Sequence, residues 1–352
     1  MRTLKRICIT TLVFLLPFTC ISGCRGRAQT EGEAQIRAKA KVQQEADLKK
    51  LHVVTTLFPY YDFTRQIAGD QVELTMVVPA GMDSHSFEPT PADIQTIQEA
   101  DVLICNGGAM EHWVSQTLEA LDTSEMTVIT MMDYVDAVEE ELVEGMEAAH
   151  GHGEDGHRED DHKEERHRDD PHEIEIEYDE HIWTSPKNAI KFTQVIGEAL
   201  AEADPQNKAV YEAGLRAYIE KLEKVHQGFL KVSQDKKRNM IIVGDKFPFR
   251  YLADEYGFEY RAAFSGCSTD TEPSARTIAY LIDKVKEDEI PIVYYLELSS
   301  HRVSEIIGEE TGAAPLLLHS CHNVTRREFE EGITYIELME HNIENLRKGL
   351  DE

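Results

Sequence analysis

The same alternation of strands and helices is predicted twice in this chain, and this repetition constrains the fold most. The first copy is expected to have strands at 53–56, 72–78 and 102–105 and a helix at 62–68. The second copy is expected to have strands at 240–243, 260–264 and 291–296 and a helix at 250–256. Such alternation is typical of parallel sheets with helices on both faces. The sequence therefore predicts an α/β fold with two similar lobes.

The loops of the two copies also correspond. Residues 58–61 and 247–249 follow the first strands and are predicted as loops. A later helix begins at 88–94 in one copy and at 272–278 in the other, each with a proline in its first turn. His85 and Cys267 lie just before these helices. Because right-handed crossovers place such loops at one edge of a sheet, the two residues are expected to occupy equivalent loops of the two lobes.

A long amphipathic helix is predicted between the lobes, running to about residue 236. Asp204 is the expected N-cap and Pro205 the first-turn proline. Its apolar face steps by four and three through Tyr211, Leu215, Tyr218, Leu222, Val225, Phe229 and Val232. A helix of this length is on the order of 45 Å long and spans the molecule, so it should limit hinge motion. Gly214 and a length of only about four heptads disfavour an intermolecular coiled coil, so we expect a monomer.

The N-terminus has the features of a bacterial lipoprotein signal. Arg2, Lys5 and Arg6 precede an apolar run at 7–18 that is too short for a stable membrane anchor. The run ends in 21–24, Ile-Ser-Gly-Cys, which resembles the lipobox whose cysteine is lipidated. We therefore expect a signal peptide at 1–23, a lipid on Cys24, and a tether at 24–50 that holds the protein outside the cytoplasm at the cell membrane. The alternative is an ordinary signal peptide with Cys24 as a free thiol.

Charge and cysteine content narrow the function further. The formal net charge of −30 argues against nucleic-acid binding and favours cations. Cys8 and Cys20 leave with the signal peptide, so Cys105, Cys267 and Cys321 remain beside the lipidated cysteine. Three thiols form at most one disulfide. Cys105 lies in an apolar strand and is expected in the core.

The tract at 147–173 is rich in histidine and acidic residues and has no large apolar side chain. Such a segment cannot offset the entropy of ordering, so we expect a disordered loop. Its imidazoles and carboxylates are ligands for divalent metals such as Zn²⁺. The predicted accessory metal-gathering residues are His150, His152, His157, His162, His167 and His172.

Two motifs carry a resemblance to a known family. The stretch at 77–90, Val-Val-Pro-Ala-Gly-Met-Asp-Ser-His-Ser-Phe-Glu-Pro-Thr, and the stretch at 179–186, Asp-Glu-His-Ile-Trp-Thr-Ser-Pro, resemble the zinc- and manganese-binding lipoproteins of bacterial ABC importers. The resemblance implies two Rossmann-like lobes joined by one long helix, with a metal held in the cleft between them. It also implies that His85 and His181 are metal ligands. The histidine-rich tract favours zinc over manganese.

The C-terminal half departs from that family where further ligands are expected. Residues 243–250, Val-Gly-Asp-Lys-Phe-Pro-Phe-Arg, lack the usual histidine or glutamate, so the third ligand is missing or replaced by Asp245. Cys267 and Cys321 are the leading candidates, with His322 as an alternate, since thiolate and imidazole together suit zinc. A disulfide between the two cysteines is the competing interpretation. Lys246 and Arg250 are expected to pair with acids of the C-terminal lobe.

The predicted function is a substrate-binding lipoprotein that captures Zn²⁺ and delivers it to the membrane permease of a metal ABC importer. The expected boundaries are 51–185 for the N-terminal lobe, 186–237 for the helical segment and 238–352 for the C-terminal lobe. A cell-surface zinc buffer or adhesin is the main alternative. A zinc enzyme would need Glu111 or Asp245 as general base, and the sequence has no His-Glu-x-x-His element, so we expect no enzyme. Glu111, His112 and His301 are predicted to be ordinary surface residues.

Overall fold

The computed structural model describes residues 50–146, 178–266 and 272–351. The predicted signal peptide, Cys24, nearly all of the tether, the histidine-rich tract and Cys267 lie outside these residues. Within the described segments, no helix combines the length and apolarity that a membrane span requires.

The first half of the chain forms a parallel four-stranded sheet with the order β2-β1-β3-β4. Its strands are β1 (Leu51–Thr55), β2 (Val72–Met76), β3 (Val102–Cys105) and β4 (Thr127–Thr130). The second half forms a parallel sheet with the equivalent order β6-β5-β7-β8. Its strands are β5 (Met240–Phe247), β6 (Glu259–Ser265), β7 (Ile292–Tyr295) and β8 (Ala314–Leu317). The predicted duplication and the α/β class are confirmed, and each sheet has one more strand than the sequence pattern indicated.

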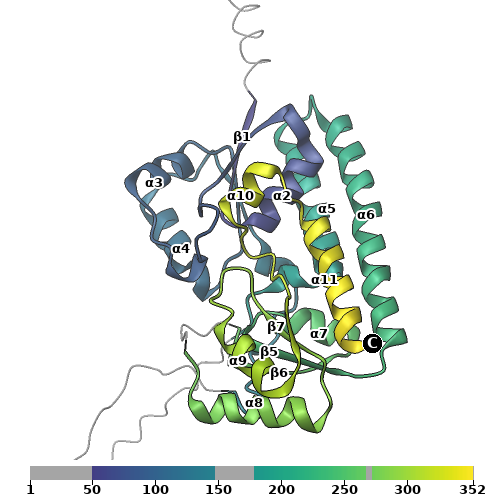
Figure 1. The fold of residues 1–352 in the computed structure, drawn as a ribbon. Coiled ribbons are helices and arrows are strands. Elements are labelled where there is room, and N and C mark those ends of the chain that lie inside the picture. The colour runs from purple at the N-terminus through teal and green to yellow at the C-terminus, as the bar shows by residue number, and fades with distance from the viewer. Residues whose placement is uncertain (1–49, 147–177, 267–271, 352) are drawn as a thin grey trace, which may run out of the picture. The chain divides into compact units, whose positions relative to one another are not determined.

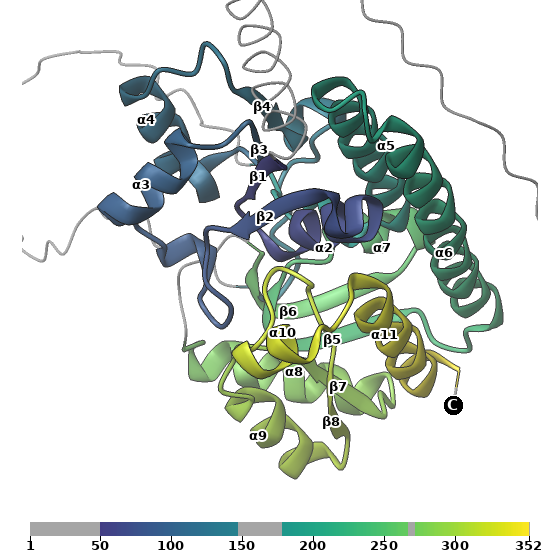
Figure 2. The same cartoon turned by 90° about the horizontal axis from the view of Figure 1, so that it is seen from above.

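Side chains alternate between the two faces of each strand, and this alternation builds the layers. In β1, Val53 belongs to the large central core, whereas Val54 packs in a separate cluster beneath α3 (Pro91–Gln98) and α4 (His112–Ala120). The second sheet likewise has an outer cluster, covered by α8 (Ala275–Glu287) and α9 (Arg302–Thr311). Figures 1 and 2 show these helix pairs beside the two sheets.

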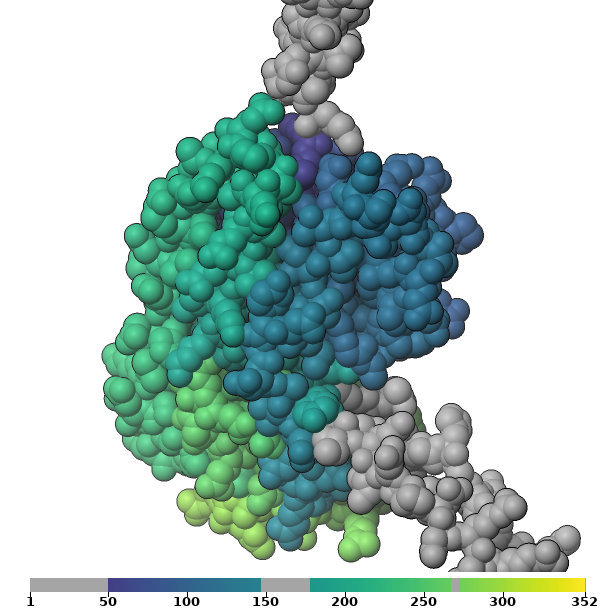
Figure 3. All heavy atoms as spheres, turned by 180° about the vertical axis from the view of Figure 1, so that it is seen from behind, coloured from purple at the N-terminus to yellow at the C-terminus, as the bar shows by residue number. Residues whose placement is uncertain are grey.

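A layer of helices shares the central core with both sheets. It consists of α2 (Phe58–Ala68), α5 (Pro186–Ala203), α6 (Lys208–Asp235), α7 (Arg250–Tyr256) and α11 (Tyr335–Leu350), and a short α10 (Arg326–Glu331) precedes the last of them. The 28 residues of α6 span about 42 Å. In Figure 3, α5 and α6 (teal to green) run along one side of both the blue first half and the lighter green second half. The predicted long helix is therefore present, and six of its seven predicted apolar positions are fully buried.

Two local predictions were wrong. Residues 58–61 are the start of α2 and not a loop, because Pro59 fits the first turn of a helix, where no backbone N–H is needed. Asp204 does not cap α6. It ends α5, and its carboxylate accepts hydrogen bonds from Asn207 Nδ2 at 2.7 Å and Tyr211 Oη at 2.8 Å. These bonds hold a turn, so that α6 begins at Lys208.

Candidate metal centre

His85 lies in the loop that follows β2, within a 3-10 turn at Ser84–Ser86. The side chain of Asp83 caps this turn, since its Oδ1 accepts a hydrogen bond from the His85 backbone N–H at 3.0 Å. Loops at the carboxyl ends of parallel strands are where α/β proteins form ligand sites. The cap therefore fixes the backbone of His85 at such an edge.

His181 immediately precedes a short 3-10 turn at Ile182–Thr184. Oδ1 of Asp179 accepts hydrogen bonds from both its backbone N–H, at 2.8 Å, and its ring Nδ1, at 3.1 Å. His181 is only 2% exposed. Its ring is oriented by a carboxylate, an arrangement common among metal-binding histidines.

His322 follows β8, and hydrogen bonds between loops bring it to the first half of the chain. The neighbouring Asn323 donates through Nδ2 to the carbonyls of Pro79 and Met82, both at 2.8 Å, and Gly81 N donates to Val324 O at 2.7 Å. The loop after β8 is thereby joined to the loop that carries His85.

Trp183 packs against the His322 ring. The two rings stack at a centroid distance of 5.3 Å and an angle of 27°, and the Trp183 indole N–H donates to Ser320 O at 2.8 Å. Ser84 Oγ also makes a short hydrogen bond with His322 Nε2.

The three imidazoles form a near-equilateral group. Ring centroids are 5.7 Å apart for His85 and His181, 5.6 Å for His85 and His322, and 6.1 Å for His181 and His322. Three imidazoles bound to one tetrahedral zinc at about 2.1 Å have ring centres roughly 5 Å apart. Asp83 adjoins the group, with ligand atoms of Asp83, His85 and His322 all within 4.8 Å of one another. His181 lies outside this closest group, so the rings would have to move inward slightly for all three histidines to bind one divalent cation.

The environment of His85 and His322 favours the neutral form of both rings. Burial, the neighbouring His181 and, to a lesser extent, Lys246 lower the pKa of His85 to about 4. Burial lowers the pKa of His322 well below its usual value, and His85, His181 and Lys246 add to this effect. Neutral imidazole is the form that binds metal. The low pKa values therefore reduce competition from protons.

A cavity of about 320 Å³ adjoins the cluster. The three histidines line it together with Asp245, Lys246 and Glu297. Burial raises the pKa of Asp245, whose Oδ1 accepts a hydrogen bond from Lys246 N at 2.8 Å. Asp245, an alternate ligand in the sequence prediction, thus reaches the cavity but is not part of the close histidine and Asp83 group.

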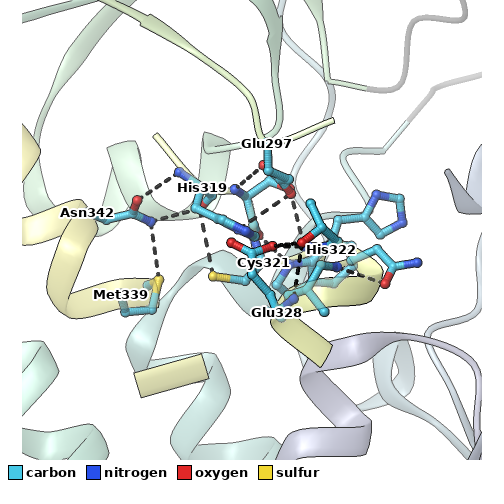
Figure 4. Close-up of polar contacts among 12 residues, drawn as sticks. Glu297, His319, Cys321, His322, Glu328, Met339 and Asn342 are labelled. Carbon is cyan, nitrogen blue, oxygen red and sulfur yellow. Dashed lines mark hydrogen bonds and ion pairs between the residues drawn. The ribbon is translucent and has the colours of Figure 1, made fainter. Parts of the chain in front are cut away.

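Cys321 is not brought to the cleft, although it precedes His322. The residue is fully buried and is a free thiol, and its Sγ donates to His319 O at 3.7 Å while its N–H donates to His319 Nδ1 at 2.9 Å. Figure 4 shows the sulfur on the side of Met339 and Asn342. Of the two neighbours, His322 and not Cys321 therefore lies beside His85 and His181. The other predicted thiol, Cys267, is outside the described residues, so its role stays a prediction.

Other sequence expectations have mixed outcomes. Arg250 pairs with Asp254 as expected, at 2.9 Å, but it also pairs with Glu141 of the first half. Lys246 lies 3.9 Å from Asp83, which is likewise an acid of the first half. Glu111 was wrongly predicted at the surface: it is 1% exposed and accepts hydrogen bonds from Asn106 N and Gly107 N. His112 is exposed and His301 half-buried. Cys105 lies in the core, as predicted.

Sequence reasoning missed Asp83 and Asp179, yet a signal for both is present. Each stands two residues before a site histidine, and each accepts that histidine's backbone N–H. The repeated Asp-x-His pattern is therefore a local device that orients the two histidines, and it is visible in the sequence once its function is known.

Comparison with known proteins gives a consistent result. The family model for zinc-uptake complex component A, periplasmic, matches residues 53–349. The high-affinity zinc uptake system protein ZnuA of Bacillus subtilis is 31% identical over 333 residues, which cover 95% of this chain and 94% of that protein. The zinc-binding lipoprotein AdcA of Streptococcus pneumoniae is 32% identical over 314 residues, which cover 88% of this chain but only 58% of the longer relative.

Solved structures agree with these matches. The metal-dependent lipoprotein YcdH of Bacillus subtilis superposes with a TM-score of 0.69 at 28% identity, covering 86% of this chain and 100% of that one. The Zn(II)-bound ZnuA-like domain of Streptococcus pneumoniae AdcA gives a TM-score of 0.67 at 29% identity, with coverage of 86% and 100%.

Proposed function

Because this chain belongs to the zinc-uptake complex component A family, we propose that it captures Zn²⁺ outside the cytoplasm and delivers it to the permease of an ABC importer. The observation that carries this proposal is the group of three histidines from separate parts of the chain, whose ring centres are spaced to within about 1 Å of the separation in a tetrahedral zinc site.

We assign His85, His181 and His322 as the histidine ligands. We assign His322 where the sequence favoured Cys321, because the thiol of Cys321 is fully buried and donates to the carbonyl oxygen of His319. Cys267 and Asp83 are the candidates for a further ligand of the metal. Nitrogen ligands favour zinc over manganese, whose usual ligands are oxygens.

Zinc titration against a competing chelator tests this assignment. His85→Ala, His181→Ala and His322→Ala should each weaken the tight site by at least about a hundredfold, roughly 2.7 kcal/mol. Cys321→Ala and His341→Ala are the controls, since His341 is exposed on α11, and both should bind as the parent does. Unchanged affinity in His322→Ala together with loss in Cys321→Ala would reverse the assignment.

A catalytic role is less favoured. The two possible general bases already accept backbone hydrogen bonds. Glu111 accepts two backbone N–H groups inside the first half, and Asp245 accepts the backbone N–H of Lys246. A cell-surface zinc buffer or adhesin would use the same site. Restoration of growth under zinc limitation separates uptake from both, because only uptake also requires the permease.

The histidine-rich tract and Cys24 complete the proposal. We propose that the tract gathers zinc weakly and that a lipid on Cys24 holds the protein at the membrane, with lobes bounded at 51–185 and 238–352. Deletion of 147–173 should remove only weak additional zinc sites, since a tract with no large apolar side chain must lose conformational entropy for each ion that it binds. Loss of the tight site on deletion would mean that the tract supplies a primary ligand. Release of Cys24→Ala protein into the medium would support the anchor.

A further inference from the structure

Lys246 reaches across the cleft to the metal-binding loop of the first half. It lies in β5 of the second sheet, yet its Nζ is 3.9 Å from Oδ2 of Asp83. The lysine side chain is 18% exposed and Asp83 is 45% exposed. The contact therefore joins two parts of the chain across the edge of the proposed zinc site.

The two oxygens of Asp83 have different surroundings. Oδ1 accepts the His85 backbone N–H and caps the turn, which fixes the direction of the carboxylate. Oδ2 is the oxygen next to Lys246. Because Asp83 also belongs to the close ligand group with His85 and His322, its carboxylate can serve either the ammonium or a metal ion.

Electrostatics makes these two uses compete. The Lys246 ammonium lies 3.9 Å from a carboxylate whose ligand atoms are within 4.8 Å of those of His85 and His322, so it stands a few ångströms from the place that the ion would occupy. Two cations a few ångströms apart in a partly buried site repel by several kcal/mol at an effective dielectric constant of about 20. Zinc and the ammonium in its present place would therefore destabilise each other.

We propose that Lys246 is a built-in counter-cation that zinc displaces from Asp83, so that Oδ2 changes from an ion-pair partner into a metal ligand. This inference rests on the proposed function and adds a device that sets affinity and release. By pairing with Asp83, the lysine lowers the zinc affinity of the site. It also gives the carboxylate an alternative partner when zinc dissociates.

The structure also provides a destination for the displaced ammonium. Lys246 lines the 320 Å³ cavity, as do the carboxylates of Asp245 and Glu297. The electrostatic interaction between Lys246 and Asp245 is already attractive, since it lowers the pKa of Asp245 against the effect of burial. A flexible lysine side chain can therefore turn from Asp83 toward these acids without entering bulk solvent.

Zinc affinity and zinc release in the full mature protein test the proposal. Lys246→Met should lower the zinc dissociation constant by about tenfold or more, equivalent to ~1.4 kcal/mol, and slow zinc release to excess chelator by a similar factor. Lys246→Arg keeps the charge and should stay within about threefold of the parent. Lys208→Met is the matched control, because it removes the same charge from a pair with Glu212 on α6.

A double-mutant cycle with Asp83→Asn identifies the shared oxygen. If Lys246 acts through Asp83, the gain from Lys246→Met should shrink to less than about threefold in the Asp83→Asn background. Tight binding by the parent with unchanged or weaker binding by Lys246→Met would overturn this inference alone. Absence of zinc binding in both proteins would overturn the proposed function with it.

Discussion

A single carboxylate oxygen of Asp179, Oδ1, accepts two hydrogen bonds from His181, one from its backbone N–H and one from its ring Nδ1. The pair is 2% exposed at both residues, and Gly266 packs against it so closely that a Cβ there would lie 3.1 Å from Asp179 Oδ2 and 3.2 Å from His181 Nδ1. The carboxylate thus fixes both the tautomer and the direction of the ring, with Nε2 as the nitrogen for a metal.

Asp179→Ala should weaken zinc binding by about 10- to 100-fold, because the ring loses its orienting acceptor while the ligand itself remains. Titration against a chelator measures the effect, and Asp70→Ala, at an exposed position, serves as the control. Equal affinity in both variants would show that Asp179 does not position His181.

Zinc affinity should depend weakly on pH above about pH 5. An unperturbed histidine of pKa about 6.5 would already be mostly protonated at pH 5.5, whereas the pKa of His85 is about 4 and that of His322 is also lowered. Because these pKa values are low, the two rings carry no proton for zinc to displace until the pH falls close to the pKa. We expect a loss of less than about tenfold between pH 7 and pH 5.5, measured in noncoordinating buffers. A hundredfold loss over that range would contradict the neutral state of the cluster.

Glu111→Gln should change how stability depends on pH. Burial raises the pKa of Glu111 to about 7, so the folded protein retains a proton that the unfolded chain releases above about pH 4.5. Stability from this group is therefore present at low pH and lost as the pH rises through about 7. Glu111→Gln should remove that loss and be more stable at pH 8, by up to about 3 kcal/mol. Urea unfolding at several pH values tests this, with the exposed Glu73→Gln as the control.

Two glycines of α6 should respond differently to alanine. A Cβ at Gly214 would lie 2.2 Å from the backbone oxygen of Ile67 in α2, whereas one at Gly228 would meet only the tip of the Ile343 side chain, at 2.5 Å. Alanine adds about 1 kcal/mol of helix propensity at either site. We therefore expect Gly214→Ala to destabilise by about 1–3 kcal/mol and Gly228→Ala to stay within about 1 kcal/mol of the parent. Equal effects in thermal unfolding would show that α2 can move away from α6.

The sequence alone was sufficient where the signal is local or periodic. The alternation of strands and helices predicted both sheets, and the spacing of apolar residues in α6 predicted its buried face, because burial acts on one side of a regular element. His85 and His181 could be proposed as ligands because each stands in a motif of contiguous residues that carries the family resemblance.

Tertiary structure decided the contacts between distant segments. The order of residues does not reveal that Lys246 meets Asp83, since that contact depends on how the two sheets are packed together. The choice of His322 over Cys321 has the same origin: Cys321 adopts a left-handed backbone conformation, with φ of 60°, and the loop that carries both is held by Asn323 to the carbonyls of Pro79 and Met82. Neighbouring side chains in such a loop diverge, and only the packing around them determines which one lies beside His85 and His181.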